Sequence, residues 1–456
     1  MRLAFSIPAA CILSSELARM QTHLADFIKD TEEGREADSI LRSCVHCGFC
    51  NATCPTYQLL GDELDGPRGR IYLIKEVLEG QLVTERTQLH LDRCLTCRSC
   101  ETTCPSGVKY HRLLDIGRAV VDRQVQRSPA DKATRFLLSE GLPRQGLLQS
   151  AVRIGQWLRP LLPEVLAAKL PTSTPTAHRA APGKPPTVHA RRMIALASCG
   201  QQALTPNTNA ALARILDHLG IEVVTPAASC CGALRYHLGA QEQALDDMRR
   251  TIDAWWPLID NASAGVEAIV MTASGCGVQV REYGELLQHD PAYAAKAARV
   301  SALARDVSEV LAAEQEELLT LLSQAGARPR LAFHSPCTLQ HGQQIRGLIE
   351  SLLVAAGYEL SPVADAHLCC GSAGTYAFTQ PALAKHLRDN KLAALAAGSP
   401  AVIVTANIGC QTHLQSGTVT PVRHWIELIA ERLDDGREVP VAARSVLNKD
   451  LLAFFA

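Results

Sequence analysis

CVHCGFCNATCP at residues 44–55 and CLTCRSCETTCP at residues 94–105 are two copies of one cysteine pattern. In each copy three cysteines stand three residues apart, and a fourth follows four residues later, directly before a proline. In electron carriers with two 4Fe-4S clusters, the first three thiolates of such a run bind one cluster and the fourth binds the other. The sequence therefore predicts one cluster held by Cys44, Cys47, Cys50 and Cys104, and a second held by Cys94, Cys97, Cys100 and Cys54.

The exchange of the fourth ligand requires the two clusters to lie close together, so the pattern favours one-electron transfer along the pair. Two other uses of cysteine fit less well. Structural zinc sites take four ligands from two Cys-x2-Cys pairs, which leaves the third cysteine of each run without a role. A disulfide framework belongs to short secreted chains, whereas this chain has 456 residues and 17 cysteines spread along it.

Composition limits the other functions. A length of 456 residues predicts two or three domains, and a hydrophobic content of 47% is ample for packed cores. The net charge of -1 and an aromatic content of 4% argue against nucleic acid as a partner. The sequence has no apolar run of the length that a membrane-spanning helix needs, so any membrane contact should be peripheral.

The first nineteen residues only weakly imitate a secretory signal, because Ala9-Ala10-Cys11 is a poor cleavage site. We expect translation to start at Met20, which leaves Cys11 outside the fold, and we expect residues 21–30 to form an amphipathic helix. Cysteines in metal-type spacing fit a reducing cytosol. The expected location is therefore cytoplasmic.

Residues 20–150 are predicted to be helical around the cysteine runs; one apolar pattern begins at Pro67 and ends at Gly80. Clusters bound by four thiolates carry negative charge, so cations near them stabilise the reduced form. The alternative is that each such side chain simply lies on a solvated helix face. The candidates are Arg42, Arg68, Arg70, Arg93, Arg98 and Lys109.

A connector follows at residues 151–190. Residues 147–170 are apolar with scattered Arg and Lys, and this segment could pack on the protein, on a partner or at a membrane interface. Residues 171–186, rich in Pro, Ser and Thr, are predicted to be an exposed linker.

The remainder repeats itself, which predicts two related α/β units at residues 191–328 and 329–440 with parallel strands. In each repeat an apolar run ends near one cysteine, a Cys-Cys-Gly triplet follows, and a second apolar run ends at a last cysteine. The first repeat has Cys199, Cys230, Cys231 and Cys276; the second has Cys337, Cys369, Cys370 and Cys410. The carboxyl ends of parallel strands form binding crevices, so each set should converge on a site.

With these motifs together, the chain resembles the iron-sulfur subunits of glycolate oxidase, a family that joins a two-cluster ferredoxin domain to two cysteine-rich "CCG" domains. The resemblance runs from about Met20 to the C-terminus, and residues 44–80 look like the glycolate oxidase branch in particular. It implies an α+β multidomain fold, with a helical two-cluster domain followed by two α/β repeats.

The resemblance also implies a function. A separate flavin subunit, accompanied by an associated subunit, would oxidise glycolate to glyoxylate. This chain would carry the electrons toward a membrane quinone or similar acceptor at the inner face of the cytoplasmic membrane. This chain has no flavin fingerprint, since Gly275-x-Gly277 lacks the third glycine. The alternatives are the equivalent subunit of a lactate or glycerol-3-phosphate dehydrogenase complex, a disulfide reductase that uses the cysteine-rich half, and a binding module braced by its clusters.

Each repeat departs from the fullest form of its motif, in which a further cysteine stands three residues before the last one. Ala273 and Asn407 occupy those positions. The four remaining cysteines of each repeat could hold an additional cluster, remain buried structural thiols or form a reactive dithiol. Three histidines in the second repeat are either further ligands or proton carriers, or hydrogen-bonded structural residues: His334, His341 and His424.

Overall fold

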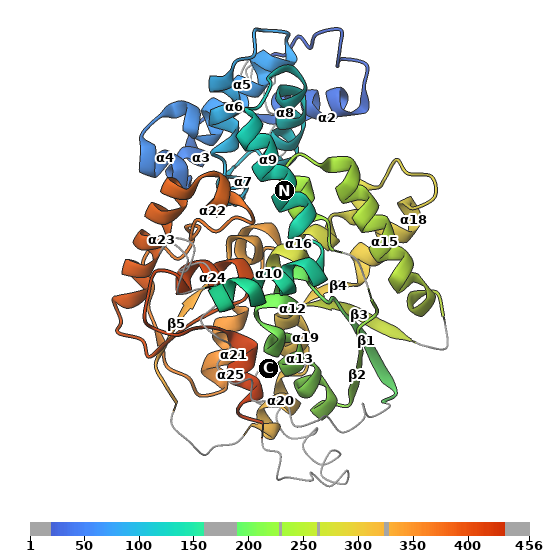
Figure 1. Cartoon of the computed structure of the whole chain (residues 1–456), viewed down its shortest axis with the longest axis vertical. Helices are drawn as coiled ribbons and strands as arrows, with labels where there is room; N and C mark the ends of the chain where they lie inside the picture. Colours follow the sequence, from blue (N-terminus) through green and yellow to red (C-terminus); the bar gives the residue numbers. More distant parts are fainter. Residues whose placement is uncertain (1–19, 159–188, 228–229, 262–264, 323–327, 434–456) are drawn as a thin grey trace, which may run out of the picture.

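The computed structural model describes residues 20–158, 189–227, 230–261, 265–322 and 328–433. A helical N-terminal part lies above two α/β units that stand side by side (Figure 1). Cys11, the linker at residues 171–186 and the predicted end of the second repeat at residue 440 lie outside the described residues. The predicted mixed fold class is confirmed, and the exact domain limits stay predictions.

The N-terminal part is built from helices alone. They are α2 (Glu32–Ser43), α3 (Phe49–Ala52), α4 (Pro55–Leu60), η1 (Glu63–Asp65), α5 (Pro67–Leu78), α6 (Glu85–Asp92), α7 (Ser99–Thr103), α8 (Tyr110–Gln124), α9 (Pro129–Gly141) and α10 (Gln145–Leu158). Helices α2, α5 and α8 enclose the core, where Leu41, Ile74 and Leu113 are fully buried. A close approach fixes this packing, because a Cβ on Gly117 of α8 would lie 2.6 Å from Ile74.

The expected helix over residues 21–30 is wrong. Residues 21–25 have no regular structure and residues 26–30 form a turn, and the Ala25 amide donates to the Leu78 carbonyl at the end of α5. Thr31 then caps α2, because its hydroxyl accepts from the Gly34 amide. The Ile28 carbonyl lies so close to Gly34 that a Cβ there would be 1.9 Å away. These tertiary contacts, together with the cap, outweigh the apolar periodicity of the segment.

The first α/β unit has a parallel sheet in the order β2-β1-β3-β4. Its strands are β1 (Arg191–Ala195), β2 (Ile221–Val224), β3 (Val266–Met271) and β4 (Ala304–Asp306). Its helices are α12 (Cys199–Leu204), α13 (Pro206–His218), α14 (Ala233–His237), α15 (Gln241–Ile259), α16 (Ser274–Arg281), α17 (Tyr283–Leu286), α18 (Ala294–Leu303), α19 (Val307–Ala313) and α20 (Gln315–Leu321).

The second unit repeats this topology with the parallel order β6-β5-β7-β8, which confirms the predicted duplication. Its strands are β5 (Leu331–His334), β6 (Leu360–Ser361), β7 (Val402–Thr405) and β8 (Val422–His424). Its helices are η3 (Thr338–Gly342), α21 (Leu348–Ala355), α22 (Tyr376–Thr379), α23 (Pro381–Ala396), α24 (Ile408–Gln415) and α25 (Trp425–Ala430).

The two units share one hydrophobic core, in which Ile215 and Leu216 of α13 pack with Trp425 and Ile426 of α25. The helices that carry their last cysteines, α16 and α24, also begin side by side, because the Ser274 amide donates to the Ala406 carbonyl over 3.1 Å. Within the described residues, no helix has both the length and the hydropathy to span a bilayer.

Candidate metal centres

The two cysteine runs of the N-terminal part adopt the same loop conformation. Each run contains a left-handed residue one position before its second cysteine and another one position after it: His46 and Gly48 in the first run, Thr96 and Arg98 in the second. Arg98 therefore holds, with φ of 60°, a conformation that glycine adopts far more readily. The repeated curl turns the first three thiols of each run toward one cavity.

The outer cavity is lined by the four cysteines that the sequence grouped as the first ligand set: Cys44, Cys47, Cys50 and Cys104. Cys47 is exposed, whereas Cys44 is buried. Apolar side chains surround this opening, and Phe49 beside it is 61% exposed. The outer cavity therefore faces the surface of the protein.

The inner cavity is lined by the second set: Cys54, Cys94, Cys97 and Cys100. Cys54, Cys97 and Cys100 are buried. The two cavities adjoin, because Pro67, Cys100 and Tyr110 line both. Two groups held here would thus be neighbours, as the exchange of the fourth cysteine requires.

The raised pKa values of these thiols fit the binding of metal ions. Burial raises the pKa of Cys50 to about 12 and raises the pKa values of Cys97 and Cys100 well above the usual range. A thiolate in these cavities is therefore costly unless a positive ion binds it, and coordination to a metal deprotonates a thiol outright. Four thiols around each of two adjoining cavities fit a pair of iron-sulfur clusters.

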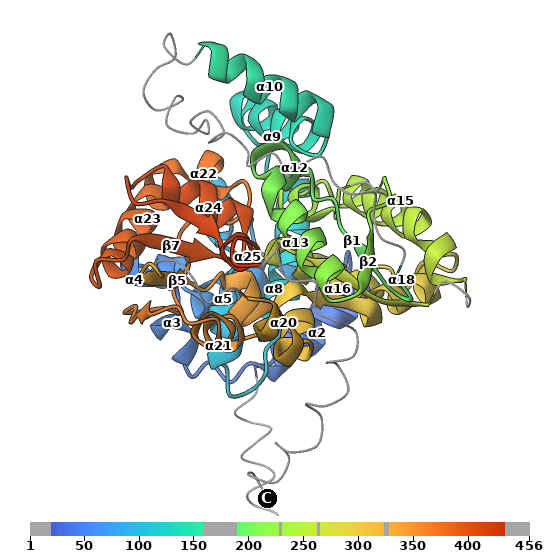
Figure 2. The ribbon, with the colours of Figure 1, turned by 90° about the horizontal axis from the view of Figure 1, so that it is seen from below.

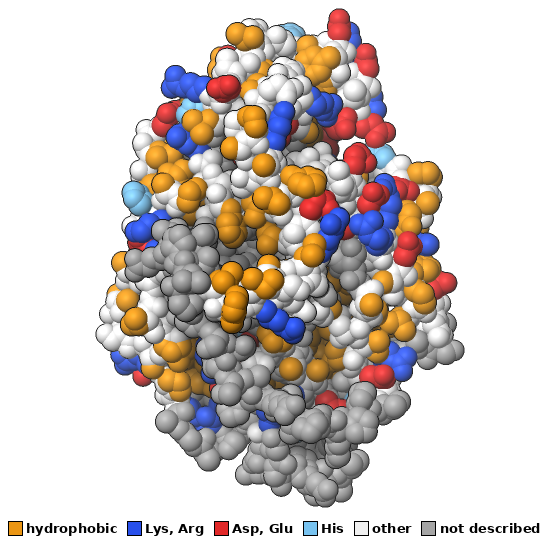
Figure 3. Space-filling model, viewed as in Figure 1, with side chains coloured by type: hydrophobic (Ala, Val, Ile, Leu, Met, Phe, Trp, Pro, Cys, Tyr) orange, Lys and Arg blue, Asp and Glu red, His pale blue; other side chains and the backbone are white. Residues whose placement is uncertain are grey.

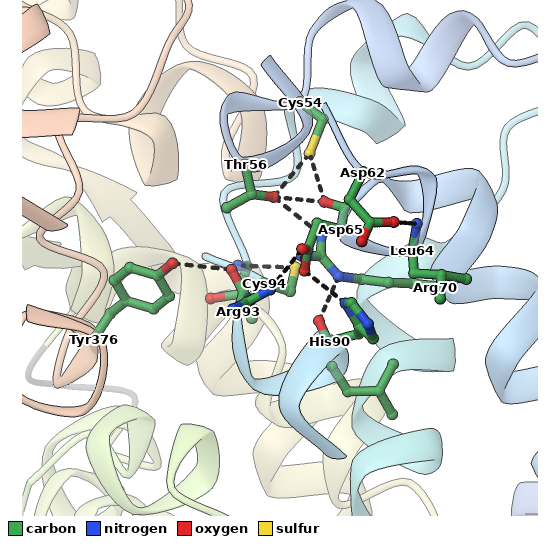
Figure 4. Close-up of polar contacts among 12 residues, drawn as sticks. Cys54, Thr56, Asp62, Leu64, Asp65, Arg70, His90, Arg93, Cys94 and Tyr376 are labelled. Carbon is green, nitrogen blue, oxygen red and sulfur yellow. Dashed lines mark hydrogen bonds and ion pairs between the residues drawn. The ribbon is translucent and has the colours of Figure 1, made fainter. Parts of the chain in front are cut away.

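A buried ion network supports the inner cavity (Figure 4). Arg70, which is 0% exposed, lines this cavity and reaches the buried Asp65 carboxylate at 3.4 Å. Asp65 also accepts from Arg93 at 2.8 Å and lies 3.0 Å from His90 Nδ1. The hydroxyl of Thr56 connects the network to the cysteines, because it accepts from Arg70 and lies 3.3 Å from Cys54 Sγ.

The other predicted cations lie in different surroundings. Arg68 lines the outer cavity and pairs with Glu63 at 2.6 Å, with both side chains partly exposed. Arg42 pairs with Asp38 on an exposed helix face, as the alternative interpretation proposed. Arg98 lines the inner cavity, is largely buried, and pairs with Glu282 of the first repeat. Lys109 is mostly exposed and pairs with Glu285.

The inner cavity lies against the second repeat. Leu95 and Cys97 pack with Cys337, Cys369 and Tyr376 in one hydrophobic cluster. The Tyr376 hydroxyl donates to the Arg93 carbonyl over 3.1 Å, so the interface also has a polar contact. A thiol of the inner cavity thus contacts cysteines of the second repeat.

In the first repeat, Cys199 Sγ and Cys230 Sγ lie 3.6 Å apart. The contact between them raises the pKa of Cys199, and contacts with Cys230 and Cys276 raise that of Cys231. Helix α12, which begins at Cys199, lies under α10 of the N-terminal part (Figure 2). The four predicted cysteines of this repeat therefore form one group.

In the second repeat, Cys337 Sγ and Cys369 Sγ lie 3.8 Å apart. His334, Cys370 and Cys410 form a buried trio whose ligand atoms all lie within 4.8 Å of one another. Asn407, which stands where the fullest form of the motif has a fifth cysteine, donates to Cys410 Sγ over 3.6 Å. The structure thus brings together the four predicted cysteines and adds a histidine.

The three candidate histidines differ in their partners. His341 contacts Thr102 Oγ1 through Nδ1 and the His367 carbonyl through Nε2, each at 2.9 Å. His424 contacts the Thr272 carbonyl at 2.8 Å and accepts from the Ile426 amide. Both are hydrogen-bonded structural residues. Among the described residues, His334 finds no hydrogen-bond partner for either ring nitrogen.

The comparisons with known proteins match the geometry. The 4Fe-4S dicluster domain family matches residues 40–108, and the cysteine-rich domain family matches residues 194–281 and 331–415. The chain is 57% identical to the glycolate oxidase iron-sulfur subunit of Escherichia coli (strain K12), over 91% of this chain and 100% of that protein. This chain belongs to the family of glycolate oxidase iron-sulfur subunits.

The chain is also similar to two further proteins. The probable glycolate oxidase iron-sulfur subunit of Bacillus subtilis (strain 168) is 31% identical over 86% of this chain and 92% of its own length. Lactate utilization protein A of Exiguobacterium sp. (strain ATCC BAA-1283 / AT1b) is 27% identical over 52% of this chain. As a member of the family, the chain is an electron-transfer subunit with two 4Fe-4S clusters.

Proposed function

We propose that the chain accepts electrons from a separate flavin subunit that oxidises glycolate to glyoxylate, and passes them toward a membrane quinone. The observation that carries this proposal is the pair of adjoining cysteine cavities, one opening at the surface and one buried against the second repeat. A flavin delivers electrons in pairs, and one-electron carriers must then separate them. Two neighbouring clusters are suited to that task.

The proposed ligands of the outer cluster are Cys44, Cys47, Cys50 and Cys104, and those of the inner cluster are Cys54, Cys94, Cys97 and Cys100. When bound, each cluster supplies a centre that takes up and releases a single electron. The protein supplies the rest: Arg70 and the network behind it place positive charge beside the inner thiols, and the shared wall at Cys100 and Tyr110 holds the two sites together.

The proposed docking site for the flavin subunit is the rim of the outer cavity. Its exposed apolar side chains are Val45, Phe49 and Tyr72. Exposed aromatic side chains in a small patch are typical anchors of protein interfaces. Electrons would enter here and leave from the inner side of the relay.

The test is reconstitution. The chain is co-purified with its flavoprotein partner, and reduction of a soluble quinone analogue is measured with glycolate, lactate and glycerol 3-phosphate in turn. The proposal expects glycolate to reduce the clusters of the complex and the isolated chain to be inactive with all three. Reduction by lactate alone would favour the second candidate, which the likeness to lactate utilization protein A supports.

A disulfide reductase is a third candidate, favoured by the close thiol pair Cys199 and Cys230. It differs from the relay in a simple readout, because the isolated chain, supplied with excess dithionite as electron donor, would then reduce a small disulfide over many turnovers. The relay predicts no such turnover.

We also propose that the protein is cytoplasmic and binds peripherally to the inner face of the membrane through α9 and α10. Hydrophobic side chains gather where these helices cross the face in Figure 3, and α10 stands out from the body in Figure 2. The most exposed are Phe136, Leu137, Leu147, Ile154 and Trp157, the last 80% exposed. Aromatic and aliphatic side chains beside Arg144 and Arg153 suit a lipid headgroup region.

Co-sedimentation with anionic lipid vesicles tests this location. We expect Trp157→Asp to weaken binding about tenfold or more, because a charge replaces an apolar contact of roughly 2 kcal/mol. Leu82→Asp is the matched control, since Leu82 is also highly exposed but lies between α5 and α6 and not on α9 or α10. Equal binding by both variants would contradict the proposal.

A further inference from the structure

His334 is the last residue of β5, at the carboxyl end of the central pair of strands in the second sheet. It pairs in register with Thr405, the last residue of β7, whose hydroxyl donates to the His334 carbonyl over 3.0 Å. The backbone of His334 is therefore fixed, and its side chain lies among the cysteines that follow these strands.

The imidazole is buried without a protein partner. His334 is 1% exposed, and among the described residues neither Nδ1 nor Nε2 has a hydrogen bond. A buried polar group left unsatisfied costs roughly 1–3 kcal/mol, so such groups are rare unless another ligand satisfies them. Its nearest candidates are sulfurs, since Cys370 Sγ and Cys410 Sγ lie within 4.8 Å of a ring nitrogen.

We propose that the second repeat holds an iron centre with His334, Cys370 and Cys410 as ligands. This centre extends the proposed relay beyond the dicluster domain, and it does not depend on which substrate the partner oxidises. The ligands of this centre are thus thiolates and an imidazole, and not the four cysteines alone that the sequence suggests for the second repeat. Imidazole and thiolate both suit iron, and histidine ligands are known in iron-sulfur centres.

The surroundings favour iron over zinc. Cys369, which pairs with Cys337, precedes Cys370 and contacts its side chain, so the pocket gathers more donors than the four that a tetrahedral zinc site takes. The same pair packs against Cys97 of the inner cavity, which places a redox-active centre next to the relay.

The residues that contact the proposed ligands also resemble those around a metal site. Asn407 donates to Cys410 Sγ, a hydrogen bond that would hold and tune a ligating thiolate. Lys391, 4% exposed, adds a buried positive charge near these thiols and is itself held by the Asp365 carbonyl at 2.7 Å. Asn407 therefore takes a supporting role at the position where the sequence showed a lost ligand.

The first repeat provides an internal control. The position equivalent to His334, three residues before the first cysteine, is Leu196 there, and the position equivalent to Asn407 is Ala273. Leu196 is 3% exposed and packs in an apolar core. The inference concerns the second repeat alone; a cluster at Cys199, Cys230, Cys231 and Cys276 stays a prediction from the sequence.

The test uses the full chain, purified without oxygen. Iron and zinc are counted per chain, and pulsed EPR measures nitrogen coupling to the paramagnetic iron, with and without isotope-labelled histidine. We expect more than the roughly eight irons that two 4Fe-4S clusters supply, and a nitrogen coupling that shifts with the label.

His334→Leu installs the residue of the first repeat. It should lower the iron content below that of the wild-type chain and abolish the nitrogen coupling, while the EPR signal of the dicluster domain remains. His334→Cys should restore the iron without the coupling, which a merely structural role would not do. His424→Gln, which changes a hydrogen-bonded histidine at the end of β8, should change neither reading.

The proposal is overturned if the wild-type chain holds about eight irons and no nitrogen coupling, if zinc takes the place of the extra iron, or if His334→Leu keeps the coupling. Because the dicluster signal is read in the same samples, loss of the whole relay is distinguished from loss of this centre.

Discussion

The outer and inner cavities arise from the same cysteine pattern but differ in their surroundings. The outer cavity has an exposed cysteine, an apolar rim and a partly exposed Arg68. The inner cavity has three buried cysteines, a fully buried Arg70 and a wall of packing against the second repeat. The motif specifies a cluster, whereas tertiary packing decides whether that cluster is an entry point or an internal relay.

The largest difference between the cavities should appear when a ligand is removed. Cys97→Ser places a hydroxyl at a buried position that also packs against Cys337 and Cys369, so we expect loss of about four irons and a clearly lower melting temperature. Cys47→Ser alters an exposed ligand, and we expect loss of the outer cluster with the fold retained. Iron analysis and circular dichroism melts measure both effects, and equal melting temperatures would remove the distinction.

Chelation in air should separate the two clusters in time. Oxidant and chelator reach the outer site through the opening at Cys47, whereas the inner site is covered by protein. We expect a fast loss of about four irons followed by a much slower loss of the rest, measured by iron release and by the EPR spectrum of the remaining cluster. A single phase that releases all iron would contradict the comparison.

Arg70 and Arg68 offer a matched pair on one helix. Arg70→Met leaves the buried Asp65 without one of its cations, and we expect a loss of about 3–5 kcal/mol in the free energy of unfolding together with a lower midpoint potential of the inner cluster. Arg68→Met breaks a partly exposed ion pair and should cost less than about 1 kcal/mol.

Denaturant unfolding and EPR-monitored redox titration provide the two readings for this pair. A similar loss of stability in both variants, or an unchanged inner potential in Arg70→Met, would show that the buried network does not distinguish the cavities.

The smallest expected effect comes from the contact between the inner cavity and the second repeat. Tyr376→Phe removes the hydrogen bond to the Arg93 carbonyl and should cost about 1 kcal/mol without changing the iron content. Tyr72→Phe is a control in the N-terminal part, since Tyr72 is 47% exposed and lies on α5 at the rim of the outer cavity. A stability loss that is the same in both would assign no special role to Tyr376.

Much of this arrangement follows from the sequence, because cysteine spacing is a local property and repeats can be recognised directly in the sequence. The grouping of the cysteines, the duplicated parallel sheets and the Asn407 and Ala273 substitutions were all visible there. The orientation of the side chains was not visible in the sequence. Arg68 and Arg70 are two residues apart on α5, and only the packing of that helix sends one to each cavity.

The same limit applies to contacts across long sequence separations. Asp65, His90 and Tyr376 join the inner site from three distant segments, and no local pattern signals them. His334, His341 and His424 look alike in the sequence, and only their hydrogen-bond partners separate the two structural histidines from the unpartnered one. Residues 21–30 have helical periodicity, but tertiary hydrogen bonds hold them in another conformation.

The most direct test of the central claim is the EPR spectrum of the full chain, purified without oxygen and reduced with dithionite. Two neighbouring 4Fe-4S clusters should give a spectrum broadened by magnetic interaction between them, from a brown protein with at least about eight irons per chain. A colourless protein without iron, or two isolated signals with no interaction, would contradict a relay through adjoining cavities.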